Sequence, residues 1–72
     1  MKDNLKLLDV VAITVDIPEQ GIFRGNVGTI VELLALGVFE VEFVDNEGRT
    51  YAELPLRAAQ LMLLRHEPAT AA

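Results

Sequence analysis

The chain contains no cysteine and no serine, and it has a single histidine among its 72 residues. Without cysteine it forms neither disulfides nor thiolate metal sites, which is common in proteins of the reducing cytoplasm. Without serine or cysteine the one histidine, His66, has no such nucleophile to activate. We therefore expect a cytoplasmic protein that is not an enzyme and needs no cofactor, and we assign no residue as a metal ligand.

Positive charge and long hydrophobic runs are scarce as well. Six Lys and Arg residues stand against eleven Asp and Glu, so the net charge is −5, whereas proteins that bind phosphate backbones present a basic surface. The longest runs without a charged residue have seven residues, far fewer than the about 20 that span a membrane. The composition disfavours nucleic acid and membranes as partners, and it indicates no small-molecule substrate.

Hydrophobic residues, by contrast, make up 51% of the chain. A domain of this length lies near the lower limit at which a single core is stable unaided. Part of the apolar surface is therefore expected to stay exposed on a lone copy, and such patches commonly mark protein contacts. The composition predicts a protein partner or self-association, with a homo-oligomer as the expected state.

Alternating apolar residues in the middle of the chain predict β-strands. From Val38 to Val44 the alternation turns Phe39, Val41 and Phe43 toward the core. A period of two in one stretch and again in the stretch before it is typical of two antiparallel strands joined as a hairpin. A helical domain would contradict this alternation.

The preceding stretch, from Val27 to Leu33, has the same period of two. Its alternation places Ile30 on the outer face, together with Leu34 beyond the end of the stretch. Earlier in the chain, the run from Val10 to Val15 is rich in β-branched residues and predicts a first strand.

A turn is predicted after the hairpin, from Asp45 to Gly48. These residues have the composition of a type I turn closed by a left-handed glycine bulge. The turn leads into a strand from Thr50 to Leu54. Because such a bulge can shift the parity of a strand, the pattern leaves open whether Tyr51 or Ala52 faces the core.

Pro55 lacks an N–H group and is expected to end that strand. The next residues, Leu56 to Gln60, are enough for one helical or 3₁₀ turn. A short apolar strand from Leu61 to Leu64 is then expected to complete the domain.

The loop of residues 16–25 carries three large apolar side chains, those of Ile17, Ile22 and Phe23. Three are too many for a freely solvated loop, so we expect the loop to fold back over one end of the core. Nearby, Gly21, Gly25 and Gly28 superficially resemble a phosphate-binding loop, but the segment leads into a strand and not into a helix. Their predicted role is turn geometry.

Together these elements predict an all-β fold, a small five-stranded SH3-like barrel with one short helical turn before the last strand. One domain is expected over residues 1–66, followed by a flexible tail over residues 67–72. An OB-fold fits less well, because only the turn at residues 45–48 separates the third and fourth strands, where that fold usually has a helix.

The chain also resembles a family of small bacterial proteins, frequent in cyanobacteria, that is known as a domain of unknown function. The resemblance implies an SH3-like barrel and no activity. It lies in Leu8 to Ala12, Ile17 to Glu19 with Gly21, Arg24 to Glu32, Val41 to Phe43, Gly48 to Ala52, and Gln60 with Leu61.

A second resemblance concerns residues 25–31 alone, which are similar to the KOW-type motif of ribosomal proteins and transcription factors. The basic residues through which those proteins contact RNA are missing here, with only Arg24 close by. An RNA- or ribosome-associated binding module is therefore the alternative hypothesis for function.

Four carboxylates are expected to share one face of the sheet. Glu40 and Glu42 lie two apart on one predicted strand, with Glu32 and Glu53 beside them on neighbouring strands. Solvated side chains of an outer face are the ordinary interpretation. A site for a hard cation such as Ca²⁺ is the alternative, which the sequence leaves open.

The connection between the two hairpin strands is unusually apolar, because Leu34 and Leu36 lie where turn residues are normally polar. Phe23 and Tyr51 are candidate aromatic contacts. These four residues are the predicted partner-binding set. The functional hypothesis is a noncatalytic protein-interaction barrel that self-associates, with an accessory or antitoxin-like role beside a partner protein.

Overall fold

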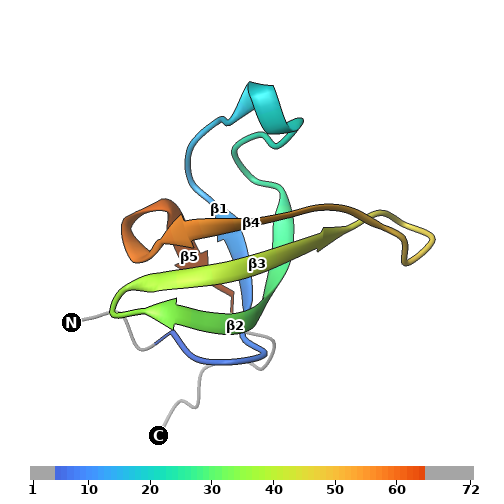
Figure 1. Cartoon of the computed structure of the whole chain (residues 1–72). Helices are drawn as coiled ribbons and strands as arrows, with labels where there is room; N and C mark the ends of the chain where they lie inside the picture. The colour runs from blue at the N-terminus through green and yellow to red at the C-terminus, as the bar shows by residue number, and fades with distance from the viewer. Residues whose placement is uncertain (1–4, 65–72) are drawn as a thin grey trace, which may run out of the picture.

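Five strands form one antiparallel sheet in the computed structural model, which describes residues 5–64 (Figure 1). They are β1 (Val10–Ile13), β2 (Val27–Ala35), β3 (Val38–Val44), β4 (Thr50–Arg57) and β5 (Leu61–Leu63), with 3₁₀ turns η1 (Pro18–Gln20) and η2 (Ala58–Gln60). Their order across the sheet is β4-β3-β2-β1-β5. The all-β prediction and the helical turn before the last strand are confirmed.

Some predictions fall outside this part of the chain. His66 and the tail predicted over residues 67–72 lie beyond the described residues, as does the expected domain boundary between them. From residue 5 to residue 64, no helix is long and apolar enough to cross a membrane.

The core lies between the inner face of the sheet and the loop after β1. Its residues are Val11, Ile13, Ile22, Ile30, Phe39, Val41, Phe43, Leu54, Leu56 and Leu61. The prediction that Phe39, Val41 and Phe43 face inward is confirmed, since Val41 and Phe43 are completely buried and Phe39 is nearly so.

The predicted parity of β2 is wrong. Ile30 is completely buried opposite Val41, whereas Val27 is about half exposed. The pairing with β3 then skips twice, once between Ile30 and Glu32 and once between Leu33 and Ala35. Because each bulge inserts one residue and resets the alternation, a strict period of two could not assign the faces of this strand.

The prediction that Pro55 ends the fourth strand is wrong. Pro55 lies inside the strand, opposite Glu40, and the strand continues to Arg57. β4 is an edge strand, and an edge tolerates a residue that donates no hydrogen bond to the sheet. The register also resolves the open parity: Ala52 packs against the core opposite Phe43, while Tyr51 is exposed.

β1 ends at Ile13, two residues earlier than predicted. The backbone N–H of Thr14 donates to the carbonyl of Gln60, at 2.9 Å, and Val15 is exposed. The chain then leaves the sheet and enters the loop that carries η1, which stands clear of the strands in Figure 1.

The loop after β1 covers the core with two of the three predicted side chains, Ile22 and Ile17. Ile22 is completely buried, and its backbone pairs with Ile17 through two hydrogen bonds of 2.8 and 3.2 Å. Ile17 is half-buried against the core, but Phe23 is 50% exposed, so the prediction that it covers the core is wrong. The predicted turn geometry is confirmed for Gly21 and Gly25, which have φ of +71° and +93°.

Gly28 has a different role from the one predicted. It lies inside β2, opposite Phe43, and its φ is not positive. A Cβ atom there would lie 2.8 Å from both the Glu42 carbonyl oxygen and Cγ1 of Val41. Glycine is needed at this position because β2 and β3 approach too closely for a side chain.

Candidate functional site

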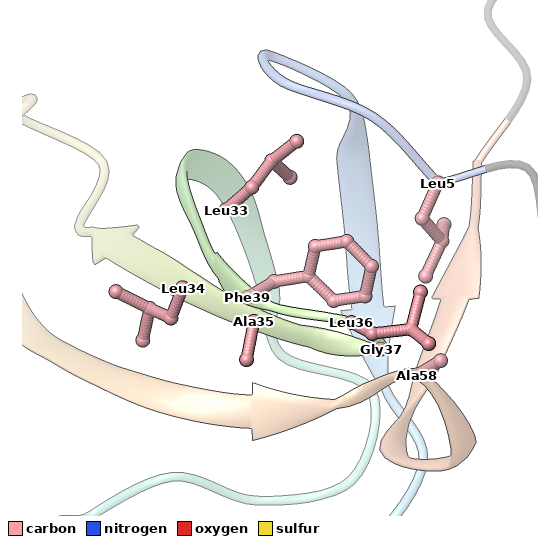
Figure 2. Close-up of a pocket in the computed structure, with 8 residues that line it drawn as sticks. All are labelled: Leu5, Leu33, Leu34, Ala35, Leu36, Gly37, Phe39 and Ala58. Carbon is pink, nitrogen blue, oxygen red and sulfur yellow. The ribbon is translucent and has the colours of Figure 1, made fainter.

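An open apolar groove of about 550 Å³ lies at the end of the β2–β3 hairpin (Figure 2). It is lined by Leu5, Leu33, Leu34, Ala35, Leu36, Gly37, Phe39 and Ala58. Every lining residue is apolar or glycine, so the groove offers no side chain that could transfer a proton, attack a substrate or bind an ion. It is suited to burying the apolar side chains of another molecule.

The hairpin turn fixes the position of the groove. Leu36 and Gly37 form a two-residue connection, and Gly37 has a φ of +74° that glycine adopts without strain. The backbone N–H of Ala58 donates to the Gly37 carbonyl at 3.0 Å, which ties the turn to η2. The exposed turn is therefore held in place by the rest of the domain.

Leu36 and Leu34 are large apolar side chains of the groove that are exposed to solvent. Leu36 is 102% exposed, at the tip of the hairpin, and Leu34 is 44% exposed, in the second bulge of β2. An isolated exposed leucine is ordinary. Leu36, Leu34 and the half-exposed Leu33 lie together on one groove, which is typical of a contact surface.

The structure brings together two of the four predicted partner-binding residues. Leu34 and Leu36 line the groove, whereas Phe23 and Tyr51 do not. Phe23 lies in the loop after η1, and Tyr51 lies near the start of β4 with its ring centroid 6.3 Å from that of Phe43. Both aromatic side chains are about half exposed, but they belong to other parts of the surface.

Sequence reasoning missed several lining residues. Phe39 was assigned to the core, where most of its surface indeed lies, and its remaining edge forms part of the groove. Leu5 and Ala58 come from opposite ends of the chain, and no sequence period connects them with the hairpin. Only the three-dimensional arrangement places them beside Leu36.

The four predicted carboxylates do lie on adjacent strands. Glu32 pairs with Glu40 between β2 and β3, and Glu42 pairs with Glu53 between β3 and β4. Partial burial raises the pKa of Glu40 above its ordinary value of 4.5, and a hydrogen bond with Glu53 and the charges of Glu53 and Glu32 raise it further. Among residues 5–64, no group of three or more His, Cys, Asp or Glu is arranged to hold a metal ion.

Replacing Glu40 with glutamine should stabilise the protein at pH 7. A raised pKa means that the folded state binds the proton more tightly than the unfolded state, so the free energy of unfolding falls as pH rises from 4.5 through the folded pKa. We expect Glu40→Gln to gain about 0.2–1 kcal/mol at pH 7, the size of a cross-strand pair. Urea denaturation at pH 4 and pH 7 measures it, and the gain should vanish at pH 4.

The matched control is Glu19→Gln, which changes a carboxylate of η1, outside the sheet. It should leave the free energy of unfolding unchanged at both pH values. A Glu40→Gln variant less stable than the native protein at pH 7 would show that the carboxylates of the sheet do not repel one another.

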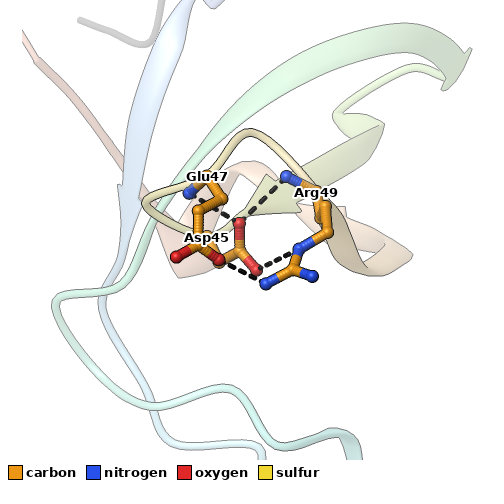
Figure 3. A network of polar contacts seen from close by, with 3 residues as sticks. All are labelled: Asp45, Glu47 and Arg49. Atoms are coloured by element: carbon orange, nitrogen blue, oxygen red, sulfur yellow. Dashed lines mark hydrogen bonds and ion pairs between the residues drawn. The ribbon is translucent and has the colours of Figure 1, made fainter.

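Asp45 organises the turn between β3 and β4 (Figure 3). Its carboxylate accepts hydrogen bonds from the backbone N–H groups of Glu47 and Arg49, both at 2.9 Å, and from Nε of Arg49 at 3.3 Å. Arg49 also pairs with the side chain of Glu47. Gly48 completes the predicted turn with a φ of +81°.

Replacing Asp45 with alanine should lower the melting temperature at pH 7. The backbone hydrogen bond from Arg49 is the main reason that the pKa of Asp45 lies below its ordinary 3.8. The carboxylate therefore stabilises the fold fully above pH 3.8, and this contribution is lost as pH falls through the lower folded pKa. Thermal melts from pH 7 to pH 2 should converge for the two proteins at the acidic end.

The control for this turn is Asn46→Ala, at an exposed position of the same turn. It should melt close to the native protein. If Asp45→Ala melted at the native temperature at pH 7, the side chain would not organise the turn.

The fold and the groove define a small all-β domain with an apolar surface at one hairpin. The chain belongs to the family described as Domain of unknown function (DUF4926), whose model matches residues 7–63. This membership confirms the resemblance seen in the sequence. No curated protein and no solved structure matches the chain.

Proposed function

We propose that this protein is a noncatalytic protein-interaction module that associates with itself through the groove at the β2–β3 hairpin. The observation that carries the proposal is the clustering of Leu33, Leu34 and the fully exposed Leu36 on one apolar groove. Removing such a surface from water contributes about 25 cal/mol for each Å², and the loss of translational, rotational and side-chain freedom on association opposes this gain.

An SH3-like barrel is the proposed architecture. It is supported by the long loop after β1, by the β2-β3-β4 meander and by the 3₁₀ turn η2 before β5. It is supported as well by β1 lying between β2 and β5, which joins the first and last strands of the domain.

A noncatalytic role is supported by the chemistry of the groove lining, which contains no ionisable or nucleophilic side chain. The accessory or antitoxin-like role beside a partner protein is a hypothesis from the small size and the acidity of the chain. The expected cytoplasmic location likewise stays a prediction.

Introducing two charges into the groove should abolish self-association. We expect the native protein to sediment with a mass that rises above 7.9 kDa between about 10 and 500 μM. The variant Leu34→Glu, Leu36→Glu should remain monomeric over that range, because two carboxylates would have to be buried in an apolar contact. Sedimentation velocity with circular dichroism as the folding check measures both effects.

The control is Phe23→Glu, which puts a charge on an exposed apolar residue outside the groove. It should associate like the native protein. A native protein that stays monomeric at 500 μM would overturn the proposed self-association, and a double variant that keeps the native mass would show that the groove is not the contact.

The KOW-like RNA-binding module is the second candidate. It is supported by Gly25, whose φ of +93° leads the chain directly into β2, and it is opposed by the net charge of −5. Filter binding with single-stranded and duplex RNA tests it. A signal that weakens steeply with salt would favour it, since phosphate contacts release counterions.

A further inference from the structure

β4 is the long free edge of the sheet among the described strands. It has eight residues and pairs there with β3 alone, whereas β5, at the opposite edge, has three residues. The unpaired N–H and C=O groups of a long edge form a template on which another extended chain can pair. The backbone of β4 therefore decides whether this protein can extend its sheet by adding a strand.

The nitrogen of Pro55 points to this free edge. In an antiparallel pair, successive N–H groups of a strand point alternately toward and away from the partner strand. Two hydrogen bonds at the end of β4 show the alternation: the N–H of Ala58 donates to the Gly37 carbonyl, on the side of β3, at 3.0 Å, and the N–H of Arg57 donates to Oε1 of Gln60 at 2.8 Å. Counting back by twos from Arg57, the nitrogens of Pro55 and Glu53 also point away from β3.

Two of these three edge positions have no N–H group to offer. Pro55 has none by its chemistry, and that of Arg57 is already bonded to the Gln60 side chain of η2. A strand that paired with this edge would leave hydrogen bonds unmade at two of three consecutive positions. Edge strands with proline resist pairing for this reason.

In other respects the edge is complementary to itself. An antiparallel pair of two β4 strands, centred on residue 55 of each, places Glu53 opposite Arg57 and Leu54 opposite Leu56. Opposite charges across a strand pair stabilise it, and the two leucines face the core in each copy. Only the centre of the pair fails, because two prolines facing each other leave both central hydrogen bonds unmade.

We propose that Pro55, together with the side chain of Gln60, blocks the free edge of β4 and so prevents two copies of this chain from joining through β4 into one continuous sheet. The inference does not depend on self-association at the β2–β3 hairpin, since none of residues 53–57 lines the groove. It assigns to Pro55 a role that its place inside a strand would otherwise leave unexplained.

Amide hydrogen exchange of the native protein tests the orientation of the edge. The N–H groups of Leu54 and Leu56 point toward β3 and should be protected, whereas that of Glu53 points to the free edge. We expect Glu53 to exchange at least about tenfold faster than Leu54 and Leu56, relative to the rates of unstructured peptides. Protection of Glu53 equal to that of Leu54 would overturn the proposed orientation.

Restoring the missing N–H groups tests the block itself. The parent protein is the variant Leu34→Glu, Leu36→Glu, in which the groove no longer contributes to association. Adding Pro55→Thr and Gln60→Ala should produce a dimer, with a mass that rises toward twice that of the parent by about 500 μM in sedimentation equilibrium. Threonine supplies the N–H group and favours extended backbone. A mass equal to that of the parent would overturn the proposal.

The matched control is Glu53→Thr in the same parent, which introduces threonine at another exposed position of β4 and leaves Pro55 in place. It should keep the mass of the parent, and association equal to that of the Pro55→Thr, Gln60→Ala variant would overturn the role of Pro55. Circular dichroism checks folding. Pro55→Thr alone keeps the Gln60 cap and should show a smaller rise in mass, so the test does not depend on the cap variant.

A charge reversal tests the register of the new contact. Adding Glu53→Arg to the Pro55→Thr, Gln60→Ala variant would place an arginine opposite Arg57 of the other copy at two symmetric positions. The dissociation constant should rise by about threefold to tenfold, as expected for surface charges. An unchanged dissociation constant would overturn the pairing of the two β4 strands about residue 55. Every comparison is made with the groove variant as parent, so failure here is distinct from failure of self-association through the groove.

Discussion

Replacing Gly28 with alanine should lower the free energy of unfolding by about 1–3 kcal/mol, the usual cost of overpacking. A Cβ atom at this position would lie 2.8 Å from the Glu42 carbonyl oxygen and 3.0 Å from Cδ2 of Phe43. Neither neighbour is free to move, since one is backbone of the adjacent strand and the other is a completely buried ring. A fold of this length has about 4–11 kcal/mol in total, so urea denaturation followed by circular dichroism should resolve the change easily.

Gly21→Asn is the control for this prediction. Gly21 has a φ of +71° and open space around its Cα, and asparagine tolerates that backbone conformation better than other residues with a side chain. The control should lose much less stability than Gly28→Ala. Equal urea midpoints for Gly28→Ala and the native protein would mean that β2 and β3 are not packed as closely as described.

Replacing Ile22 with alanine should lower the free energy of unfolding by about 2–4 kcal/mol. Ile22 is completely buried, although it lies in a loop and not in the sheet. Removing its side chain leaves a cavity beneath the loop that rigid strands cannot fill. The melting temperature should fall by about 8–30 °C, at roughly 4–8 °C for each kcal/mol in a domain of this size.

The adjacent residue provides a matched comparison. Phe23 is 50% exposed, so Phe23→Ala should change the free energy of unfolding by about 0.5 kcal/mol or less, as is usual at the surface. If the two alanine variants lost equal stability, the loop after β1 would not cover the core through Ile22.

The faces of β3 could be assigned from the sequence because its inward residues, Phe39, Val41 and Phe43, are apolar and alternate with the outward-facing residues. The strand also contains no inserted residue. The alternation of β2, in contrast, predicts the wrong face for Ile30. Its apolar residues occupy both faces, and two inserted residues shift its register. A single sequence does not show the inserted residues, because bulges depend on the pairing of both strands.

Pro55 and Gly28 illustrate a second limit. Proline usually ends a strand and glycine usually marks a turn, but the position of each residue in this sheet overrides that tendency. Pro55 is tolerated because β4 has no neighbour on its outer side among the described strands, and Gly28 is needed because Phe43 lies opposite it. Both facts follow from the order and register of the strands, which local propensity does not determine.

The candidate site was partly predictable. Leu34 and Leu36 were predicted as partner-binding residues because a hairpin connection is seldom apolar, and the structure places both on the groove. Phe23 and Tyr51 were chosen as exposed aromatic residues and belong elsewhere. The rest of the groove depends on the contact between η2 and the hairpin, which includes the hydrogen bond from Ala58 to Gly37. No sequence motif predicts this contact.

The central claim is that the β2–β3 hairpin end is the surface through which this protein associates. A dilution series of amide NMR spectra from about 1 mM to about 20 μM, a range that brackets weak interfaces, tests it most directly. The account predicts concentration-dependent shifts at residues 33–39 and at Ala58, with few changes in η1 and in the turn at Asp45. Spectra that do not change with concentration, or changes centred on Phe23 or Tyr51, would contradict it.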